Sequence, residues 1–330
     1  MPKAILHHDE RLTWPGAVSL ERGDGWTMPW RIPHEQRLLF HPALVERASG
    51  PAGVRITFQS DTTFVNGTIE PHPDLQKIEL SCDGKSVGTV DLAATDRFEF
   101  GDLPDGTKRI ELWLPQYGAF RLKGLELSDD AALAKVQDSR LKWITYGSSI
   151  THCSGAASPM QTWPAIVARG HRLNLTCLGF GGQCHLDPMI ARVMRDRPAD
   201  FLSMCVGINI MGGASLNART FAPGIIGFVQ IVREKHPETP FVVMSPIFSP
   251  PREEKPNVVG LDLKTMRSEV QSAVQAMREV GDPNVYYVNG LDVFGPDLAG
   301  FLPDDLHPDA EGYRRMGANF LEKVAQRCFV

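Results

Sequence analysis

The spacing of apolar positions changes near residue 130 and divides the chain into two halves. From residue 53 to about 128, short runs rich in Val, Ile, Thr and Phe alternate with turn-forming groups such as Asp83-Gly84 and Pro104-Asp105-Gly106. Six or more short strands at this spacing predict a β-sandwich. The expected strands cover 54–59, 63–70, 77–81, 97–100, 109–114 and 120–127.

The second half alternates continuous apolar runs with longer segments of helical period. Continuous apolar runs are typical of strands buried on both faces of a sheet, and five of them occur, at 141–146, 173–178, 201–206, 241–244 and 285–288. Helices are expected at about 163–172, 187–196, 218–235 and 261–280, with a last helix from Pro308 to about Gln326. This alternation predicts a doubly wound, flavodoxin-like parallel sheet of five strands.

The polar segment 129–140 shows neither period and is interpreted as a connector. We therefore expect an N-terminal all-β sandwich domain, jelly-roll-like, at 1–135 and an α/β domain at 136–330. The first domain carries Trp26, Trp30 and Trp113, which offer either a platform for stacking sugars or the core filling that is tryptophan's commoner use. Its sequence leaves the role of this domain open.

Composition narrows the classes of partner. The chain has 330 residues, 42% of them apolar, and a net charge of -5 without a run of Lys or Arg, so it lacks the electrostatic footprint of nucleic-acid binding. The polar N-terminus and the absence of long apolar runs argue against a signal peptide or a membrane anchor, and we expect a cytoplasmic protein. Homo-oligomerisation is left open.

The six cysteines include no CxxC pair and are expected to be reduced, structural thiols. Cys184 and His185 are neighbours, but a zinc site needs three or four ligands and no further cluster stands at ligand spacing. We expect no metal and no cofactor.

The ends of the predicted parallel strands carry the candidate chemistry, because ligands bind at the carboxyl edge of such sheets. Residues 147–151 read Gly-Ser-Ser-Ile-Thr and make Ser149 a candidate nucleophile; the alternative is a serine-rich turn. Gly182 lies in a glycine-rich exit that frees backbone N–H groups or merely makes a tight turn. Asn209 follows the third strand and is either an amide donor or a helix cap.

The fifth strand is followed by residues 301–308, which read Phe-Leu-Pro-Asp-Asp-Leu-His-Pro. Proline is tolerated in a first helical turn, so His307 is expected at the entrance of the last helix. Asp304, three residues earlier, can fold back onto its Nδ1–H and leave Nε2 free to accept a proton. The alternative is a helix-entry cap with solvated carboxylates.

Taken together, these residues resemble the SGNH, or GDSL-like, hydrolases, whose four blocks occur here in the family's order over about 140–330. The resemblance implies that Ser149 is the nucleophile, His307 the general base and then acid, and Asp304 its orienting carboxylate. It also implies an oxyanion hole formed by the backbone N–H groups of Ser149 and Gly182 and the side chain of Asn209.

Two positions depart from the family pattern: Ser148 replaces the Asp of the usual Gly-Asp-Ser, and Ile210 replaces the Asp that ends the asparagine block. Both lost carboxylates normally support rather than react. Arg252, in a loop after the fourth strand, is either a contact for a polar substrate group or a solvated charge. His152 and His185 are interpreted as supporting or surface histidines.

The layout resembles a subgroup with an N-terminal β-sandwich that includes carbohydrate acetylesterase-like enzymes and acyltransferases. We therefore expect a serine esterase that hydrolyses small acyl esters, acetyl above all and carbohydrate esters among them, through an acyl-enzyme. The first alternative is an acyltransferase that passes the acyl group to an alcohol. The second is a non-catalytic carbohydrate-binding protein on the same scaffold.

Overall fold

The computed structural model describes residues 1–329, which form two compact units. The first unit comprises Met1–Ser139 and two short later segments, Ser158–Met160 and Asn174–Thr176. The second unit comprises Arg140–Ala157, Gln161–Leu173 and the chain from Cys177 onward.

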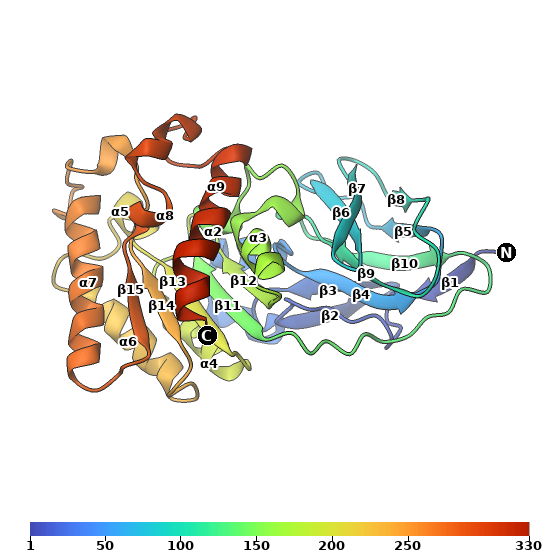
Figure 1. Ribbon diagram of the computed structural model, residues 1–330, viewed down its shortest axis with the longest axis horizontal. Helices are drawn as coiled ribbons and strands as arrows, with labels where there is room; N and C mark the ends of the chain where they lie inside the picture. The colour runs from blue at the N-terminus through green and yellow to red at the C-terminus, as the bar shows by residue number, and fades with distance from the viewer. Residues whose placement is uncertain (330) are drawn as a thin grey trace. The chain divides into compact units, whose positions relative to one another are not determined.

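The first unit is a β-sandwich of two antiparallel sheets (Figure 1). One sheet has the order β2-β3-β10-β5-β8, with β1 also paired to β10; its strands are β1 Lys3–Leu6, β2 Ser19–Gly23, β3 Trp26–Trp30, β5 Val65–Ile69, β8 Arg97–Phe100 and β10 Leu122–Leu127. The other has the order β4-β9-β6-β7, with β4 Arg55–Ser60, β6 Lys77–Cys82, β7 Lys85–Asp91 and β9 Lys108–Trp113. The expected sandwich is confirmed.

Cross-strand pairs of large apolar residues hold the sandwich together. Ile56 stands opposite Leu112 and Phe58 opposite Ile110 in the β4–β9 pair, and all four side chains are buried. Such facing pairs stabilise a sheet because their side chains bury each other's surface.

Two of the three tryptophans considered above as a stacking platform are core residues. Trp113 is 2% exposed and Trp30 is 9% exposed, and Trp30 donates its indole N–H to Glu21. Trp26 is half-buried beneath the guanidinium of Arg121, 4.9 Å from its ring centre. The tryptophans therefore form no open stacking platform.

Four strands, the 3-10 helix η1 His34–Leu39 and one α-helix of the first unit were not predicted. Strand β7 is mostly exposed and contains a glycine, and β2 is largely polar, so neither shows a clear buried face. β1 and β3 lie in the first 52 residues, where no alternating pattern stands out. Helix α1, Pro42–Ser49, is short; it begins at a proline and is capped by His41.

The second unit is built on a sheet of the order β12-β11-β13-β14-β15. These strands are β11 Lys142–Gly147, β12 Asn174–Gly179, β13 Phe201–Cys205, β14 Phe241–Met244 and β15 Val285–Val288. Parallel registers join β11 to β13, β13 to β14 and β14 to β15. The order along the chain, 2-1-3-4-5, is that of flavodoxin-like folds, so the expected doubly wound sheet is confirmed.

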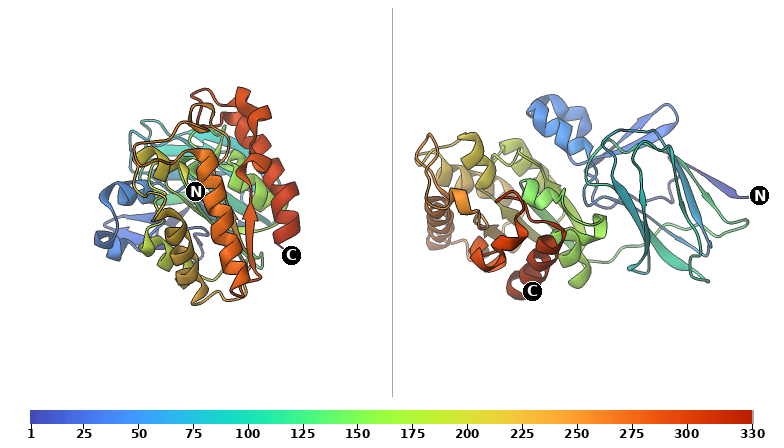
Figure 2. Two further views of the ribbon diagram at one scale, coloured as in Figure 1. Left: turned by 90° about the vertical axis from the view of Figure 1, so that its left-hand side faces the viewer. Right: turned by 90° about the horizontal axis from the view of Figure 1, so that it is seen from above.

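Helices flank this sheet in two groups, which Figure 2 shows from two further directions. In one group α3, Trp163–Gly170, packs with α9, Ala310–Phe320; in the other α4, Pro188–Asp196, and α7, Leu263–Glu279, pack with α6, Phe221–Arg233. The short helical turns are α2 Ser149–His152, η2 Pro159–Gln161, α5 Ile208–Gly213, η3 Pro250–Arg252, α8 Gly290–Val293, η4 Pro296–Phe301, η5 Leu321–Ala325 and α10 Gln326–Cys328.

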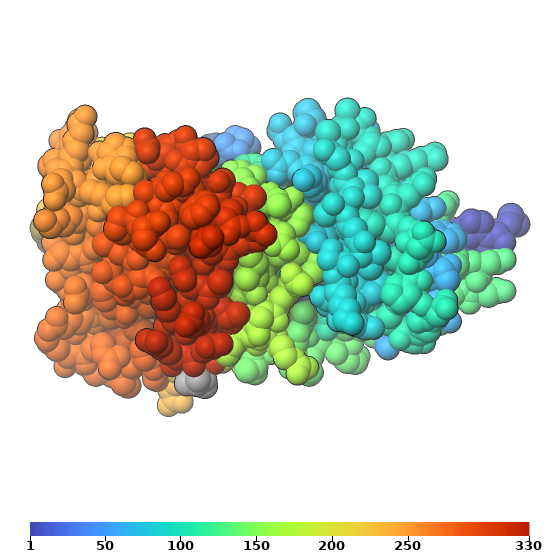
Figure 3. Space-filling model, turned by 45° about the horizontal axis from the view of Figure 1, so that its top comes forward, coloured from blue at the N-terminus to red at the C-terminus, as the bar shows by residue number. Residues whose placement is uncertain are grey.

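Aromatic side chains fix the C-terminal helix to the sheet. Trp143 of β11 stacks on Phe320 at the end of α9 with ring centres 5.9 Å apart, and Trp163 of α3 lies 4.9 Å from the same ring. The C-terminal segment, red in Figure 3, covers much of the visible face of this unit. The packing anchors the helix that follows the DxxH block.

The start of α9 differs by two residues from the sequence expectation. The helix begins at Ala310 instead of Pro308, because the carboxylate of Asp309 accepts the N–H of Gly312 at 2.8 Å and acts as the N-cap. His307 consequently lies in the connection before the helix.

Three further findings concern residues 1–329. No helix there combines the length and apolar character needed to cross a bilayer. All six cysteines are free thiols, and burial raises the pKa of Cys205 to about 12. No three His, Cys, Asp or Glu side chains in that range lie together as metal ligands would.

Candidate active site

The first strand of the parallel sheet ends in a glycine and two serines. β11 ends at Gly147, and Ser148 then caps the one-turn helix α2 by accepting the N–H of Ile150 at 3.2 Å. A Cβ atom at Gly147 would lie 2.1 Å from the hydroxyl oxygen of Thr151, so glycine allows this close approach. Ser149 is the first residue of α2 and is half-buried.

Three side chains from distant parts of the second unit form a hydrogen-bonded chain. Ser149 Oγ lies 2.8 Å from His307 Nε2, although 158 positions separate the two residues in the sequence. His307 Nδ1 lies 2.6 Å from Oδ2 of Asp304. When Nδ1–H is donated to the carboxylate, Nε2 carries the lone pair and faces the serine hydroxyl. The structure thus brings together the three residues expected to form a triad.

The backbone of its own loop holds Asp304 in place. Its Oδ1 accepts the N–H groups of Leu306 and His307 at 3.1 and 2.7 Å. Burial raises the pKa of the Asp304 carboxyl, but the hydrogen bonds from His307 and Leu306 outweigh burial and lower the pKa below its usual range. Asp304 is therefore ionised at neutral pH and aligned to accept the imidazole N–H.

The second strand leads into a turn that contains Gly182. Gln183 donates its N–H to the carbonyl of Phe180 at 3.0 Å and closes a four-residue turn. Gly182, its third residue, has a φ of +72°, the sign that a type II turn requires. A Cβ built on Gly182 would meet open space, so the backbone conformation is what favours glycine here.

Asn209 follows the third strand, in helix α5. Gly207 before it has a φ of +127°, and a Cβ at that position would lie 2.6 Å from the ring of Pro246. The side-chain oxygen of Asn209 accepts the N–H of Cys184 at 3.0 Å. Because its oxygen is engaged with the loop that follows Gly182, the amide nitrogen of Asn209 points away from that bond.

Three N–H donors at this edge of the sheet have no acceptor within residues 1–329. They are the backbone N–H of Ser149, the backbone N–H of Gly182 and the side-chain NH₂ of Asn209. An oxyanion hole consists of donors that are fixed in advance and still free to bind a developing negative charge. All three groups expected to form such a hole are available to a ligand.

Arg252 is engaged by the loop that carries the DxxH block. Its Nη1 donates to Ser249 Oγ at 3.0 Å and lies 3.5 Å from the carbonyl oxygen of Asp305. Ser249 Oγ donates to the same carbonyl at 2.7 Å. Arg252 therefore supports the loop between Asp304 and His307, and a contact with substrate stays a prediction.

Two histidines interpreted from the sequence as supporting or surface residues contact the turn around Gly182. His152 is 1% exposed, and its Nδ1 accepts the N–H of Gly181 at 3.2 Å. His185 Nε2 lies 3.0 Å from the carbonyl oxygen of Gly182. The sequence signals only that both histidines lie near site motifs; their contacts depend on how the loop folds.

An apolar crevice borders the residues next to the triad. Ile150, Ile208 and Leu306, which follow or precede site residues in the sequence, line it together with the ends of β13 and β14. The crevice is too narrow to admit a water-sized sphere. The apolar side chains next to the triad residues are therefore closely packed on this side of the site.

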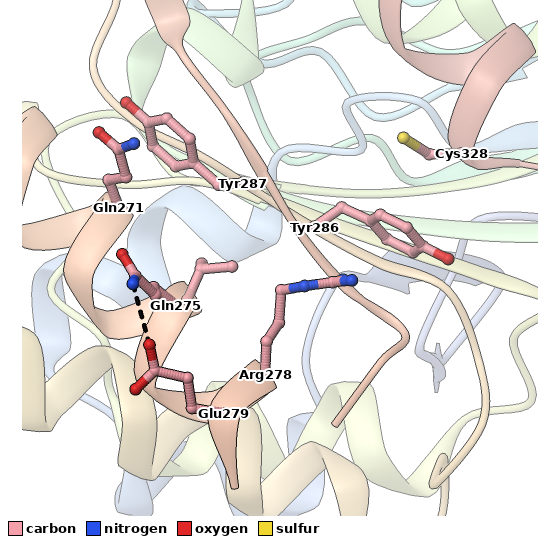
Figure 4. A pocket seen from close by; sticks show the side chains of 8 residues that line it. Gln271, Gln275, Arg278, Glu279, Tyr286, Tyr287 and Cys328 are labelled. Atoms are coloured by element: carbon pink, nitrogen blue, oxygen red, sulfur yellow. Dashed lines mark hydrogen bonds between the residues drawn. The ribbon is translucent and has the colours of Figure 1, made fainter. Parts of the chain in front are cut away.

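A larger hollow of about 610 Å³ lies along α7 and the outer strand β15 (Figure 4). Two tyrosines of β15 line it, with Gln275, Arg278 and Glu279 of α7. Some of its polar groups already have partners: Gln275 donates to Glu279 at 2.9 Å, and Arg278 donates to the carbonyl of Val285 at 2.8 Å. None of its lining residues belongs to the triad, and we assign no function to this hollow.

Two family models match the chain. The model described as the GDSL-like lipase/acylhydrolase family matches residues 141–326, and the model described as the SsfX3 N-terminal domain matches residues 12–123. A search of curated proteins found no match.

Solved structures share the whole architecture. The salicylyl-acyltransferase SsfX3 from a tetracycline biosynthetic pathway has 36% sequence identity and a TM-score of 0.92, over 99% of this chain and 97% of that chain. A putative GDSL-like lipase from Bacteroides ovatus has 20% identity and a TM-score of 0.79, over 99% and 98%. A family two carbohydrate esterase from Clostridium thermocellum has 16% identity and a TM-score of 0.65, over 86% and 96%.

Proposed function

Because the chain belongs to the GDSL-like lipase/acylhydrolase family, we propose that it is a serine esterase that hydrolyses small acyl esters. The observation that carries the proposal is the chain of contacts from Ser149 Oγ to His307 Nε2 at 2.8 Å and from His307 Nδ1 to Asp304 at 2.6 Å. A serine hydroxyl is a weak nucleophile until an oriented base removes its proton, and this arrangement supplies the base and its orienting group.

In the first half-reaction, Ser149 Oγ attacks the ester carbonyl carbon while His307 Nε2 takes the hydroxyl proton. The carbonyl oxygen becomes negatively charged, and the imidazolium is stabilised by the Asp304 carboxylate. The intermediate then expels the alcohol, which takes the proton from His307, and the acyl group stays on Ser149. Water attacks the acyl-enzyme by the same route and releases the carboxylic acid.

The negative charge on the carbonyl oxygen is received by the N–H groups of Ser149 and Gly182 and by the side-chain amide of Asn209. These donors need no reorganisation when the charge develops, and loss of one such donor typically costs about 3 to 4 kcal/mol of transition-state stabilisation.

The two departures from the family motif leave this chemistry intact. Ser148 is fully buried and caps α2. Ile210 is fully buried in the core. Both residues therefore contribute to the fold at these positions. Neither position supplies a reacting atom in the mechanism above. The proposal of a non-catalytic binding protein is therefore weaker than that of an enzyme.

A second candidate reaction is transfer of the acyl group to an alcohol. The observation that favours it is the 36% identity to a salicylyl-acyltransferase over 99% of this chain. The first half-reaction is the same, and the two activities differ only in whether water or an acceptor alcohol attacks the acyl-enzyme. The fold likeness to carbohydrate esterases, at 16% identity or less, adds acetylated sugars as substrates to test.

The first experiment is hydrolysis of p-nitrophenyl esters from acetyl to octanoyl, with Ser149→Ala as control and an alcohol acceptor in parallel reactions. We expect activity on short chains that the substitution abolishes. Product that shifts from free acid to a new ester when alcohol is added would favour the transferase.

A fluorophosphonate that labels activated serines provides a readout independent of the substrate choice. Labelling of the wild type and not of Ser149→Ala supports the nucleophile even if every ester tested is poor. A wild type that is inert on all esters and resists labelling would overturn catalysis in favour of carbohydrate binding.

A further inference from the structure

The backbone N–H of Gly182 belongs to the central peptide of the turn from Phe180 to Gln183. A type II turn has ψ of about +120° at its second residue and φ of about +80° at its third, whereas a type I turn has about -30° and -90°. Changing one type into the other rotates the central peptide by roughly half a turn. The direction of the Gly182 N–H therefore depends on the turn type.

The residues of the turn do not fix that choice by themselves. Both central residues, Gly181 and Gly182, are glycines, which adopt positive and negative φ with similar ease. Gly182 is exposed, and no neighbouring atom lies within 4 Å of a Cβ built on it. Both signs of φ are therefore accessible to Gly182, and contacts from outside the turn can select the observed value of +72°.

His152 holds the peptide that precedes the central one. Its Nδ1 accepts the N–H of Gly181 at 3.2 Å, and its side chain is 1% exposed. His152 ends the same one-turn helix that begins with Ser149. The contact therefore ties the turn to the element that carries the proposed nucleophile.

His185 holds the peptide that follows the central one. Its Nε2 lies 3.0 Å from the carbonyl oxygen of Gly182, which only accepts, so this nitrogen carries the hydrogen. Its Nδ1 lies 2.7 Å from Ser215 Oγ, which fixes the plane of the ring. The peptides on both sides of the Gly182 N–H are thus held by imidazoles from different segments.

The same loop also fixes the second donor. Cys184, which lies between Gly182 and His185, donates its N–H to the side-chain oxygen of Asn209 at 3.0 Å. A change in the turn would therefore disturb both the Gly182 N–H and the orientation of the Asn209 amide.

We infer that His152 and His185 are positioning residues that hold the 180–183 turn so that the Gly182 N–H faces the reacting carbonyl oxygen. The inference deepens the proposed function and rests on it. In this role the two histidines act on the rate through the geometry of the oxyanion hole.

The test compares substitutions that remove each contact with substitutions that keep it. His185→Phe keeps a ring but loses the donor, whereas His185→Gln retains an N–H group near the position of Nε2. His152→Leu loses the acceptor, whereas His152→Asn retains an oxygen near the position of Nδ1. His8→Phe is the matched control, because His8 is exposed and its contacts are with His7.

Each variant is assayed for kcat and KM on p-nitrophenyl acetate, for inhibition by ethylboronic acid and for fluorophosphonate labelling. We expect His185→Phe and His152→Leu to lower kcat by about tenfold to a hundredfold, below the loss typical of a whole donor, with KM nearly unchanged. The boronate adduct is tetrahedral and anionic, so its inhibition constant should rise by a similar factor. His185→Gln and His152→Asn should recover most of kcat.

The outcomes separate the inference from the proposed function. Wild-type kcat in His185→Phe, or equal losses in the Phe and Gln variants, would overturn the role of His185. A matching fall in thermal stability and labelled fraction, with no rescue by Asn, would reduce His152 to a folding residue. A wild type without esterase activity or labelling would overturn the mechanism and the inference together.

Discussion

A pair of buried charged side chains in the first unit contrasts with a set of less buried N–H donors in the second. In the first unit, Arg31 is fully buried and donates to the backbone carbonyls of Gly50 and Arg47, each at 2.5 Å. Glu79, 3% exposed, accepts the hydroxyl of Ser86 at 2.7 Å. Arg31 thus links the end of β3 to helix α1, and Glu79 links β6 to β7, so both charged groups are paired within the fold.

The second unit leaves polar groups open at one edge of its sheet. The N–H groups of Ser149 and Gly182 and the amide of Asn209 lack acceptors among the described residues. Gly182 is exposed and the other two residues are half-buried, so water can bind these donors at little cost, and a ligand can replace that water. The paired charges of the first unit stabilise the fold, whereas the open donors of the second unit remain available for binding.

The largest loss of activity is expected when a triad side chain is removed. We expect Ser149→Ala or Asp304→Asn to lower kcat by about 10⁴-fold or more, with little change in stability. The lowered pKa of Asp304 keeps it ionised from pH 5 upward, so substitution and not mild acid is needed to remove its charge. Steady-state kinetics across this pH range test the expectation, and an Asp304→Asn variant of normal activity would exclude it from the triad.

Removal of a single open donor should have the next largest effect. We expect Asn209→Ala to lower kcat by about 10²–10³, roughly 3 to 4 kcal/mol of transition-state stabilisation. Asn66→Ala, in β5 of the first unit, is the matched control. A loss under tenfold for Asn209→Ala, measured on p-nitrophenyl acetate, would remove Asn209 from the oxyanion hole.

Removal of a paired, buried charge of the first unit should lower stability and leave activity nearly unchanged. Arg31→Met leaves the carbonyls of Gly50 and Arg47 without this donor, and we expect the free energy of unfolding to fall by about 2 to 4 kcal/mol. Urea unfolding measures this loss, while kcat per folded molecule should change less than twofold. A large drop in kcat at full folding would show that the first unit takes part in the reaction.

The smallest expected effect concerns the preference for acyl chain length. Leu306 borders the narrow apolar crevice, and its truncation would open space next to His307. We expect Leu306→Ala to raise the ratio of hexanoyl to acetyl ester hydrolysis by a few fold, which corresponds to about 0.8 kcal/mol, the burial of one methylene group. Leu38→Ala, at a 92% exposed position, should leave the ratio unchanged.

The sequence predicts the second unit better than the first. All five parallel strands appear within two residues of their expected bounds, because buried runs such as Phe241–Met244 are apolar throughout. In the sandwich, β7 exposes most of its residues and no residue of β2 is fully buried, so neither strand carries such a signal. The helix at Pro42–Ser49 shows that a short helical stretch can lie within a mainly β pattern.

The candidate site likewise contains residues that the sequence identifies and residues that it does not. Ser149, Asn209 and His307 are recognisable because each stands at a strand exit or before a helix, with residue types suited to acyl transfer. The two histidines that contact the turn around Gly182 belong to no comparable sequence motif. His152 and His185 acquire their contacts only when the loop after β12 folds back on α2 and on itself.

The sequence by itself determined the period of each half, the order of the candidate blocks and the residue types available for chemistry, since all of these are local properties of the chain. The fold as a whole brings Ser149 and His307, 158 positions apart, to 2.8 Å, and leaves three donors at the sheet edge without an acceptor among residues 1–329. The physical reason is that hydrophobic period and turn chemistry act over a few residues. Contacts between distant residues depend instead on the order in which the strands pair and on how their connecting loops pack.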